Sequence, residues 1–165
     1  IKEPHRRMGH SRTSERLFPA SLSPEALNAL GKGTLGEALG MQFTVVDERH
    51  LEATMPVDAR TRQPMGLLHG GASVALAETL GSVASAVLVG PDRVAVGLEI
   101  NANHLRAKRS GTVTGRVEPL HLGRRTHVWE VKIRDEQGAL VCVSRMTVAV
   151  LDREADAARL GNDAR

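Results

Sequence analysis

The sequence predicts an α+β fold in which one antiparallel sheet wraps around a single long helix. Only residues 69–89 form an apolar segment of helical length, and apolar residues occur on every side of it, which is typical of a covered helix. The other regular segments alternate apolar and polar residues with the period of two that strands show. Short connections between successive strands favour antiparallel pairing. A lone apolar helix is covered only if the sheet curls around it.

A short helix is predicted near the N-terminus. Ser23 is a residue type that caps helices, and Pro24 suits the first helical position. This helix is expected to run to Leu30 and to end at Gly31. Residues 34–39 predict one further turn.

Two strands are predicted before the long helix, at residues 41–46 and 51–57. Pro56 is expected at the end of the second strand or on an edge strand, because proline cannot donate a hydrogen bond to a neighbouring strand. The long helix is expected to end at Gly90. Four strands follow it, with a hairpin turn at Asp135 to Gly138; their predicted ranges are 94–100, 112–117, 126–133 and 140–150.

We expect three parts: a basic N-terminal arm with the short helix at 1–33, the main domain at 34–152 and a polar tail at 153–165. The net charge of +3 lies entirely in residues 1–16, and the remaining chain is neutral overall. Aromatic residues make up only 2% of the chain, too few for a stacking platform for single-stranded nucleic acid. We therefore expect no nucleic-acid partner, with salt-dependent binding through the arm as an alternative.

The composition indicates a cytoplasmic protein without a membrane partner. The single cysteine, Cys142, excludes an internal disulfide framework and a thiol metal cluster. No secretory signal is visible in the charged N-terminal residues. The apolar run 72–89 contains Glu78 and three serines, so a transmembrane helix is not expected.

Glu78 is the only ionisable side chain within the helix between His69 and Val89. An ionised carboxylate is costly to bury unless it is paired, so this residue is a candidate for function. Alternatively, it faces a solvent gap or a subunit interface. Ser82 and Ser85 follow on the same helical face, where a hydroxyl can share a water with the carboxylate or simply pack against the sheet.

Gly70 and Gly71 open the long helix, where backbone N–H groups lack helical partners and can stabilise a carbonyl oxygen or oxyanion. The alternative is a tight turn between strand and helix. Glu78 lies about 10 Å or more further along the same helix, so the two features are expected to meet across a dimer interface.

Other polar residues surround this segment. Gln63 can donate a side-chain hydrogen bond without bringing charge. His69 and His104 can orient groups or transfer protons, although a lone histidine is more often structural. No spaced zinc motif is present, so no metal is expected.

Basic and hydroxyl side chains at two strand ends are candidates for binding phosphates. They are Arg106 at one strand end, and Arg125 and Thr126 at another. The alternative is an ordinary solvated surface.

Residues 63–71, with the sequence Gln-Pro-Met-Gly-Leu-Leu-His-Gly-Gly, together with Glu78 and Ser82, resemble the hotdog-fold acyl-CoA thioesterases. The similar branch is the PaaI-like and 4-hydroxybenzoyl-CoA thioesterase type, particularly its 1,4-dihydroxy-2-naphthoyl-CoA and enterobactin-pathway proofreading thioesterases. Residues 96–104 and 119–123 continue the resemblance, which covers about residues 34–151.

The resemblance implies hydrolysis of acyl-CoA thioesters, aromatic or of short to medium chain length, to free acid and CoA. It implies that Gln63 and the Gly70 N–H polarise the thioester carbonyl. Glu78 of the opposite subunit then acts as nucleophile or general base, and Ser82 positions Glu78 or the water. The chain is expected to form a dimer or a dimer of dimers, with CoA as part of the substrate and no further cofactor.

The remaining candidate residues are expected to contact the substrate. His69 lies beside the thioester in this scheme; the binding residues are Gly71, His104, Arg106, Arg125 and Thr126. Two other functions stay open: a hotdog enoyl-CoA hydratase or dehydratase, and a non-catalytic acyl-CoA binding protein. Release of free CoA thiol distinguishes hydrolysis from both.

Overall fold

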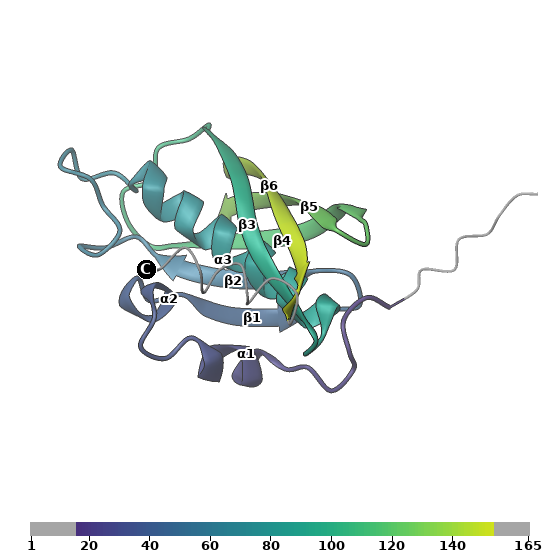
Figure 1. Cartoon of the computed structure of the whole chain (residues 1–165). Helices are drawn as coiled ribbons and strands as arrows, with labels where there is room; N and C mark the ends of the chain where they lie inside the picture. Colours follow the sequence, from purple (N-terminus) through teal and green to yellow (C-terminus); the bar gives the residue numbers. More distant parts are fainter. Residues whose placement is uncertain (1–15, 154–165) are drawn as a thin grey trace, which may run out of the picture.

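The computed structural model describes residues 16–153, which form three helices and six strands (Figure 1). The bounds in chain order are α1 (Pro24–Leu30), α2 (Leu35–Ala38), β1 (Gln42–Val46), β2 (Leu51–Pro56), α3 (Gly70–Val89), β3 (Arg93–His104), β4 (Thr112–Leu122), β5 (Thr126–Asp135) and β6 (Leu140–Asp152). Each lies within a few residues of its predicted range. Residues 1–15 of the predicted arm and 154–165 of the predicted tail lie outside the described part.

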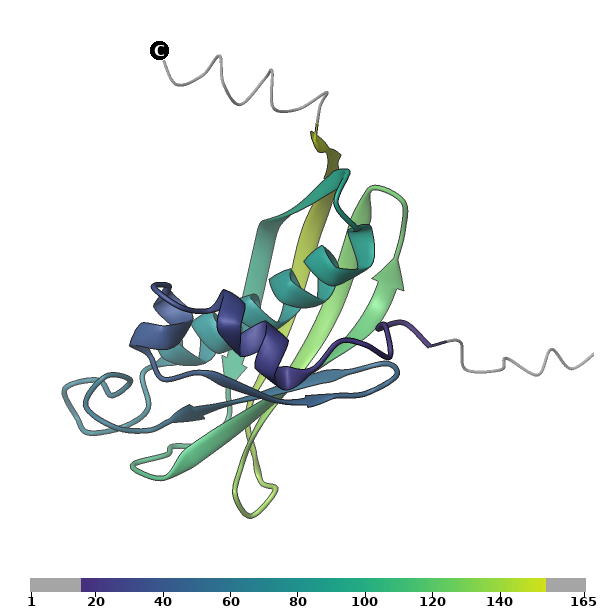
Figure 2. The same cartoon turned by 90° about the horizontal axis from the view of Figure 1, so that it is seen from below.

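The six strands form one sheet of order β1-β2-β4-β5-β6-β3, and all neighbouring pairs are antiparallel. The sheet curls around α3, and α1 lies against β1 (Figures 1 and 2). The predicted architecture is confirmed. Chain order alone does not place β3, because this strand pairs with β6 along its length and is separated from β4 in the sheet.

The long helix is covered on one side only, and the prediction of burial all round is wrong for the single chain. Its buried residues face the sheet: Ala72, Ser73, Leu76, Ala77, Leu80, Gly81, Ala84 and Ser85. Gly71, Glu78 and Ala86 are exposed. By length and composition alone α3 is apolar enough to span a membrane, a property that core helices of soluble proteins share.

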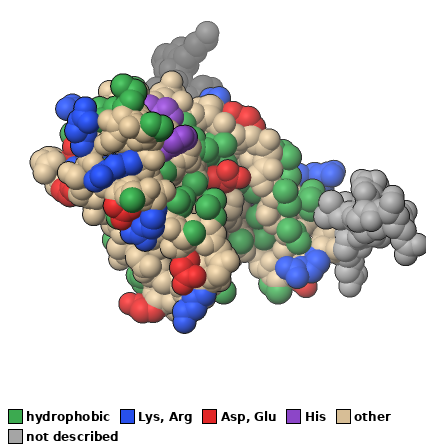
Figure 3. All heavy atoms as spheres, turned by 90° about the vertical axis from the view of Figure 1, so that its left-hand side faces the viewer, with side chains coloured by type: hydrophobic (Ala, Val, Ile, Leu, Met, Phe, Trp, Pro, Cys, Tyr) green, Lys and Arg blue, Asp and Glu red, His purple; other side chains and the backbone are tan. Residues whose placement is uncertain are grey.

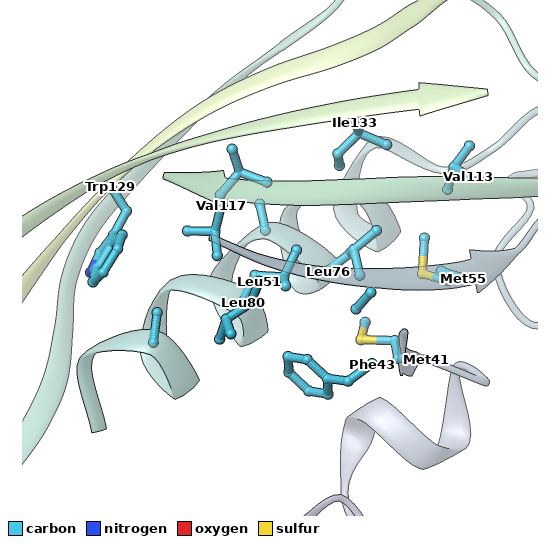
Figure 4. Close-up of a cluster of buried hydrophobic side chains, with 14 of the residues drawn as sticks. Met41, Phe43, Leu51, Met55, Leu76, Leu80, Val113, Val117, Trp129 and Ile133 are labelled. Atoms are coloured by element: carbon cyan, nitrogen blue, oxygen red, sulfur yellow. The ribbon is translucent and has the colours of Figure 1, made fainter. Parts of the chain in front are cut away.

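Small residues allow α3 and the sheet to pack closely. A Cβ placed on Gly115 of β4 would lie 2.7 Å from Cδ1 of Leu80, and one on Gly81 would lie 2.7 Å from Sδ of Met146. At either position a side chain would force its neighbour to shift, so the two glycines favour this close spacing. Figure 4 shows the surrounding aliphatic core, in which Trp129 and Phe43 are the aromatic residues labelled.

The N-terminal helix is fixed to the sheet by reciprocal hydrogen bonds. Asn28 donates from Nδ2 to the Phe43 carbonyl at 3.0 Å and accepts from the Phe43 N–H at 2.7 Å. The predicted cap is confirmed, because Oγ of Ser23 accepts from the Ala26 N–H at 3.3 Å. Leu27 is buried, so α1 contributes to the main core.

A buried polar group joins α3 to β5. Oγ of Ser85 accepts from Nε1 of Trp129 at 2.7 Å and lies 3.1 Å from Nδ1 of His127. Tryptophan is only a donor, so the Ser85 hydroxyl proton is free to bond Nδ1. This pairing is consistent with a neutral His127, and burial lowers the pKa of its imidazole, with smaller contributions from Arg93 and His121.

We predict that Gly115→Ala lowers the free energy of unfolding by about 1–3 kcal/mol, because the added methyl group overpacks the contact with Leu80. Urea denaturation measures this change. Thr114→Ala, on the opposite face of the same strand, is the control and should stay within about 0.5 kcal/mol. Equal effects of the two substitutions would contradict the close-packing argument.

We also predict that stability falls as the pH drops below about 6.5, where an unperturbed histidine takes up a proton. The unfolded chain binds this proton more readily than the folded chain, because the pKa of His127 is lowered on folding. His127→Asn keeps an acceptor for Ser85 without titrating, so its loss of stability between pH 7 and 5 should be smaller. An unchanged pH dependence of the unfolding free energy in this variant would refute the assignment.

Candidate functional site

The first turn of α3 is capped by a histidine. Nδ1 of His69 accepts a hydrogen bond from the Gly71 N–H at 2.8 Å. The His69 backbone N–H donates to the Thr61 carbonyl at 2.8 Å, and the Thr61 hydroxyl donates to the Pro56 carbonyl at 2.7 Å. The His69 ring therefore caps the start of α3, and Thr61 links the His69 backbone to the end of β2.

A second histidine lies on the same turn. His104 is the last residue of β3, and a Cβ placed on Gly70 would lie 2.7 Å from its Nε2 atom. A Cβ placed on Gly71 would lie 3.0 Å from Nδ1 of His69. The two glycines thus leave room for two imidazole rings. Histidine side chains gather beside Lys and Arg side chains on the face shown in Figure 3.

The first-turn donors of α3 differ in availability. The Ala72 and Ser73 N–H groups donate to the His69 carbonyl at 3.0 and 3.3 Å, and the Gly71 N–H donates to the His69 ring. Within residues 16–153, only the Gly70 N–H of this turn has no partner. Gly70 therefore supplies the open donor, whereas the N–H of Gly71, a predicted binding residue, is engaged.

Gln63 lies in the loop that precedes this turn. Its Oε1 accepts from the Met65 N–H, and its own backbone N–H donates to the Leu67 carbonyl at 2.8 Å. A bridge between Arg62 and Leu68 closes the loop directly before His69. The Gln63 side-chain oxygen is thus used within the loop.

Glu78 lies in a different place, two turns along α3. Its carboxylate is exposed, and a Cβ placed on Gly97 of β3 would lie 3.4 Å from its Oε1 and 3.2 Å from Cε of Met146. We call Glu78, Gly97 and Met146 the Glu78 notch. It opens into a hollow of about 190 Å³ that Leu98 and Glu99 also line. Solvent or a partner subunit, one of the sequence-based alternatives, therefore faces this carboxylate.

The two serines that follow Glu78 differ in environment. Ser82 is half-buried one turn away and remains a candidate to position a water. Ser85 is fully buried against Trp129 and cannot share a water with Glu78. Both lie on the side of α3 that carries Glu78, but β5 covers this side at Ser85 and leaves it open at Glu78.

The strand register separates the candidate residues into two groups. His104 is aligned with Cys142 of β6, and Gly97 with Val148, seven residues along the same strand pair. At about 3.3 Å per residue, His104 beside the helix start and Gly97 in the Glu78 notch are about 23 Å apart along β3. One chain therefore does not bring them together.

The candidate phosphate ligands are also divided. Arg106 follows His104 by two residues, and its N–H donates to the Val141 carbonyl at 3.3 Å. Arg125 and Thr126 lie at the other end of the sheet, where Thr126 is aligned with Ala149. Arg106 therefore belongs to the helix-start end and Arg125 to the end of the Glu78 notch.

Sequence reasoning missed Gly97 and Met146, which shape the surroundings of the carboxylate. Glycine inside a strand is a signal for close approach, so Gly97 was detectable in principle. Met146 carries no such signal because its contact depends on strand order. Among the described residues, no cluster of three or more His, Cys, Asp or Glu side chains is arranged to hold a metal ion.

Comparison with known proteins identifies the family. Residues 65–142 match the family model described as the thioesterase superfamily. The chain is 52% identical over 135 residues to the 1,4-dihydroxy-2-naphthoyl-CoA hydrolase of Escherichia coli K12, covering 82% of this chain and 99% of that protein. It is 55% identical over 135 residues to the proofreading thioesterase EntH of Cronobacter turicensis, covering 82% and 98%.

A solved structure shows the same fold. The crystal structure of a mutant thioesterase from Pseudomonas aeruginosa superposes with a TM-score of 0.80 at 49% sequence identity, covering 82% of this chain and 99% of that chain. The antiparallel sheet and its central helix are thus the hotdog fold of thioesterases.

Proposed function

This chain belongs to the thioesterase superfamily and is a thioester hydrolase, and from that premise we propose how it hydrolyses acyl-CoA thioesters to a free acid and CoA. The observation that carries the proposal is the division of one helix into two functional parts. The Gly70 N–H is an open donor, and the Glu78 carboxylate is exposed eight residues later. At about 1.5 Å per residue these parts are about 12 Å apart, so a complete site needs a second subunit.

The second subunit is proposed to pair along β3. This strand is at the edge of the sheet, and Val96 and Leu98 are 40% and 64% exposed. An open edge is a template for pairing with another strand. Antiparallel pairing about a twofold axis near Asn101 sets His104 opposite the partner's Leu98. Each helix start then faces the other subunit's Glu78 notch.

The chemistry follows from this arrangement. The Gly70 N–H and the Gln63 amide group donate to the thioester oxygen, where negative charge develops in the transition state. The partner's Glu78 either attacks the carbonyl carbon, which expels CoA thiolate and leaves an anhydride for water to cleave, or removes a proton from the attacking water. Trapping of an acyl-enzyme distinguishes the two routes. Ser82 holds the water or the carboxylate.

The CoA phosphates are assigned to basic residues from both subunits. Arg106 lies at the helix-start end, and antiparallel pairing brings it toward the partner's Arg125 and the partner's Thr126. Guanidinium groups and a hydroxyl suit phosphate oxygens. His69 and His104 stand beside the thioester.

The acyl group is assigned to the cavity of about 590 Å³ between α1, α2, β1 and α3. Thr79 and Val83, which follow Glu78 and Ser82 on α3, line this cavity. Leu27, Leu30, Met41 and Phe43 are among the other apolar residues that line it. The volume is typical of small-molecule sites, and it suits an aromatic or medium-length acyl group.

The broader assignments belong to the same proposal. We assign catalysis to residues 34–152, with α1 packed on this domain so that its Leu27 lines the acyl cavity. A dimer of dimers in the cytoplasm is the proposed working form, with CoA only as part of the substrate and no bound metal.

We predict that Glu78→Ala and Glu78→Gln each lower kcat for CoA release by at least about 100-fold, because both remove the carboxylate. A thiol reagent measures release over a panel of aryl, short-chain and long-chain acyl-CoAs. Glu118→Gln, which alters an exposed carboxylate bound to Arg116, is the control and should keep wild-type activity. Wild-type turnover in a folded Glu78→Ala variant would reject the mechanism.

We also predict that two inactive variants restore activity when they are mixed. In a mixed dimer of Glu78→Ala and Gln63→Ala, one site retains an intact Glu78 and an intact Gln63. Random re-pairing makes half of the dimers mixed, so about a quarter of the wild-type rate should return. Unfolding and refolding the mixture provides the exchange, and each variant refolded alone is the control. No recovery, with dimers formed, would place the complete site within one chain.

A further inference from the structure

The two ring nitrogens of His69 have different roles, which the contacts of the ring define. Nδ1 accepts the Gly71 N–H at 2.8 Å, so this nitrogen carries no proton. The proton of the neutral ring is then on Nε2. With Nδ1 occupied and Nε2 protonated, the ring has no free lone pair in its plane. His69 therefore cannot act as a general base while the cap is in place.

The cap also determines which donor remains for a ligand. The His69 carbonyl and ring together accept the N–H groups of Gly71, Ala72 and Ser73. For the described part of the chain, this leaves the Gly70 N–H as the open donor of the first turn. The His69 N–H is itself bonded to the buried Thr61, so the capping residue is fixed on its other side.

The neighbouring ring supports this view of the turn. His104 lies against Gly70, where a Cβ would come within 2.7 Å of its Nε2 atom. A shift of the first turn would therefore move Gly70 into or away from the His104 ring. The direction of the Gly70 N–H depends on the cap that holds this turn.

We propose that His69 is a positioning residue, which acts as a neutral N-cap on Gly71 and aims the Gly70 N–H at the thioester oxygen without transferring a proton. This inference rests on the proposed function and specifies how its donor site is built. Because the donor acts on charge that develops in the transition state, loss of the cap lowers kcat and leaves KM nearly unchanged.

Two amide substitutions test the two ends of the ring. His69→Asn places its oxygen near the position of Nδ1, and asparagine is a strong N-cap. His69→Gln reaches toward the position of Nε2 and loses the cap. With benzoyl-CoA as substrate, we expect His69→Asn to keep kcat within about threefold, whereas His69→Gln and His69→Ala lose about tenfold or more. The melting temperature should follow the same order.

The control variant is Val131→Ala, which removes buried methyl groups from β5 away from the proposed site. It should lower the melting temperature and leave kcat unchanged, so a general loss of stability does not mimic the effect at His69. The proposal is overturned if His69→Asn has the wild-type melting temperature but is as inactive as His69→Ala, because the imidazole itself is then required. Wild-type kcat in His69→Gln also overturns it.

Failure of the proposed function gives a different result. If the wild type releases no thiol from any acyl-CoA in the panel, the hydrolytic assignment fails. The melting temperatures of the Asn, Gln and Ala variants then still test whether His69 caps α3. Equal melting temperatures for His69→Asn and His69→Ala would overturn the assignment of the cap.

Discussion

The close packing of α3 against the curved sheet is the constraint on which the rest of the structure depends. Gly81 on the helix and Gly115 on β4 allow the approach, because side chains at these positions would collide with Met146 and Leu80. Burial of one face of α3 against the sheet leaves its opposite face, which carries Glu78, exposed. In the proposed dimer, the residues on this uncovered face are directed toward the partner.

This packing explains why the candidate catalytic residues are split between two places. A straight helix holds Gly70 and Glu78 at a fixed separation, and the extended strand β3 separates His104 from Gly97 by about twice that span. Neither element can fold back to close the gap within a chain. In the proposed dimer, an antiparallel copy supplies the missing half, and the same twofold operation brings Arg106 toward the opposite end of the partner's sheet. Dimer formation and catalysis are therefore linked in the proposed enzyme.

The helix start shows how glycine and histidine act together. Side chains at Gly70 and Gly71 would approach the His104 and His69 rings closely. The two glycines therefore serve mainly to make room for these imidazole rings. Because the Gly71 N–H is occupied by His69, the turn offers one open donor rather than a diffuse positive end. A single oriented N–H stabilises a developing oxyanion at a defined position, which a mobile solvent dipole does not.

The sequence by itself determined the α+β architecture and the position of nearly every element, and it singled out Glu78 and the Gly70 turn as the candidates on which the proposed mechanism rests. These features are local: strand alternation, helix caps such as Ser23 and an isolated acid in an apolar helix follow from neighbouring residues. Family membership, confirmed by comparison, also follows from the local motif at residues 63–71.

Only the tertiary structure decided what depends on long-range pairing. It placed β3 beside β6, which left one side of α3 open and brought Gly97 and Met146 against Glu78. It separated Ser85 from the site by covering it with Trp129, and it assigned the Gly71 N–H to His69. Strand order and ring orientation are set by the packing of residues distant in sequence, so no local pattern encodes them.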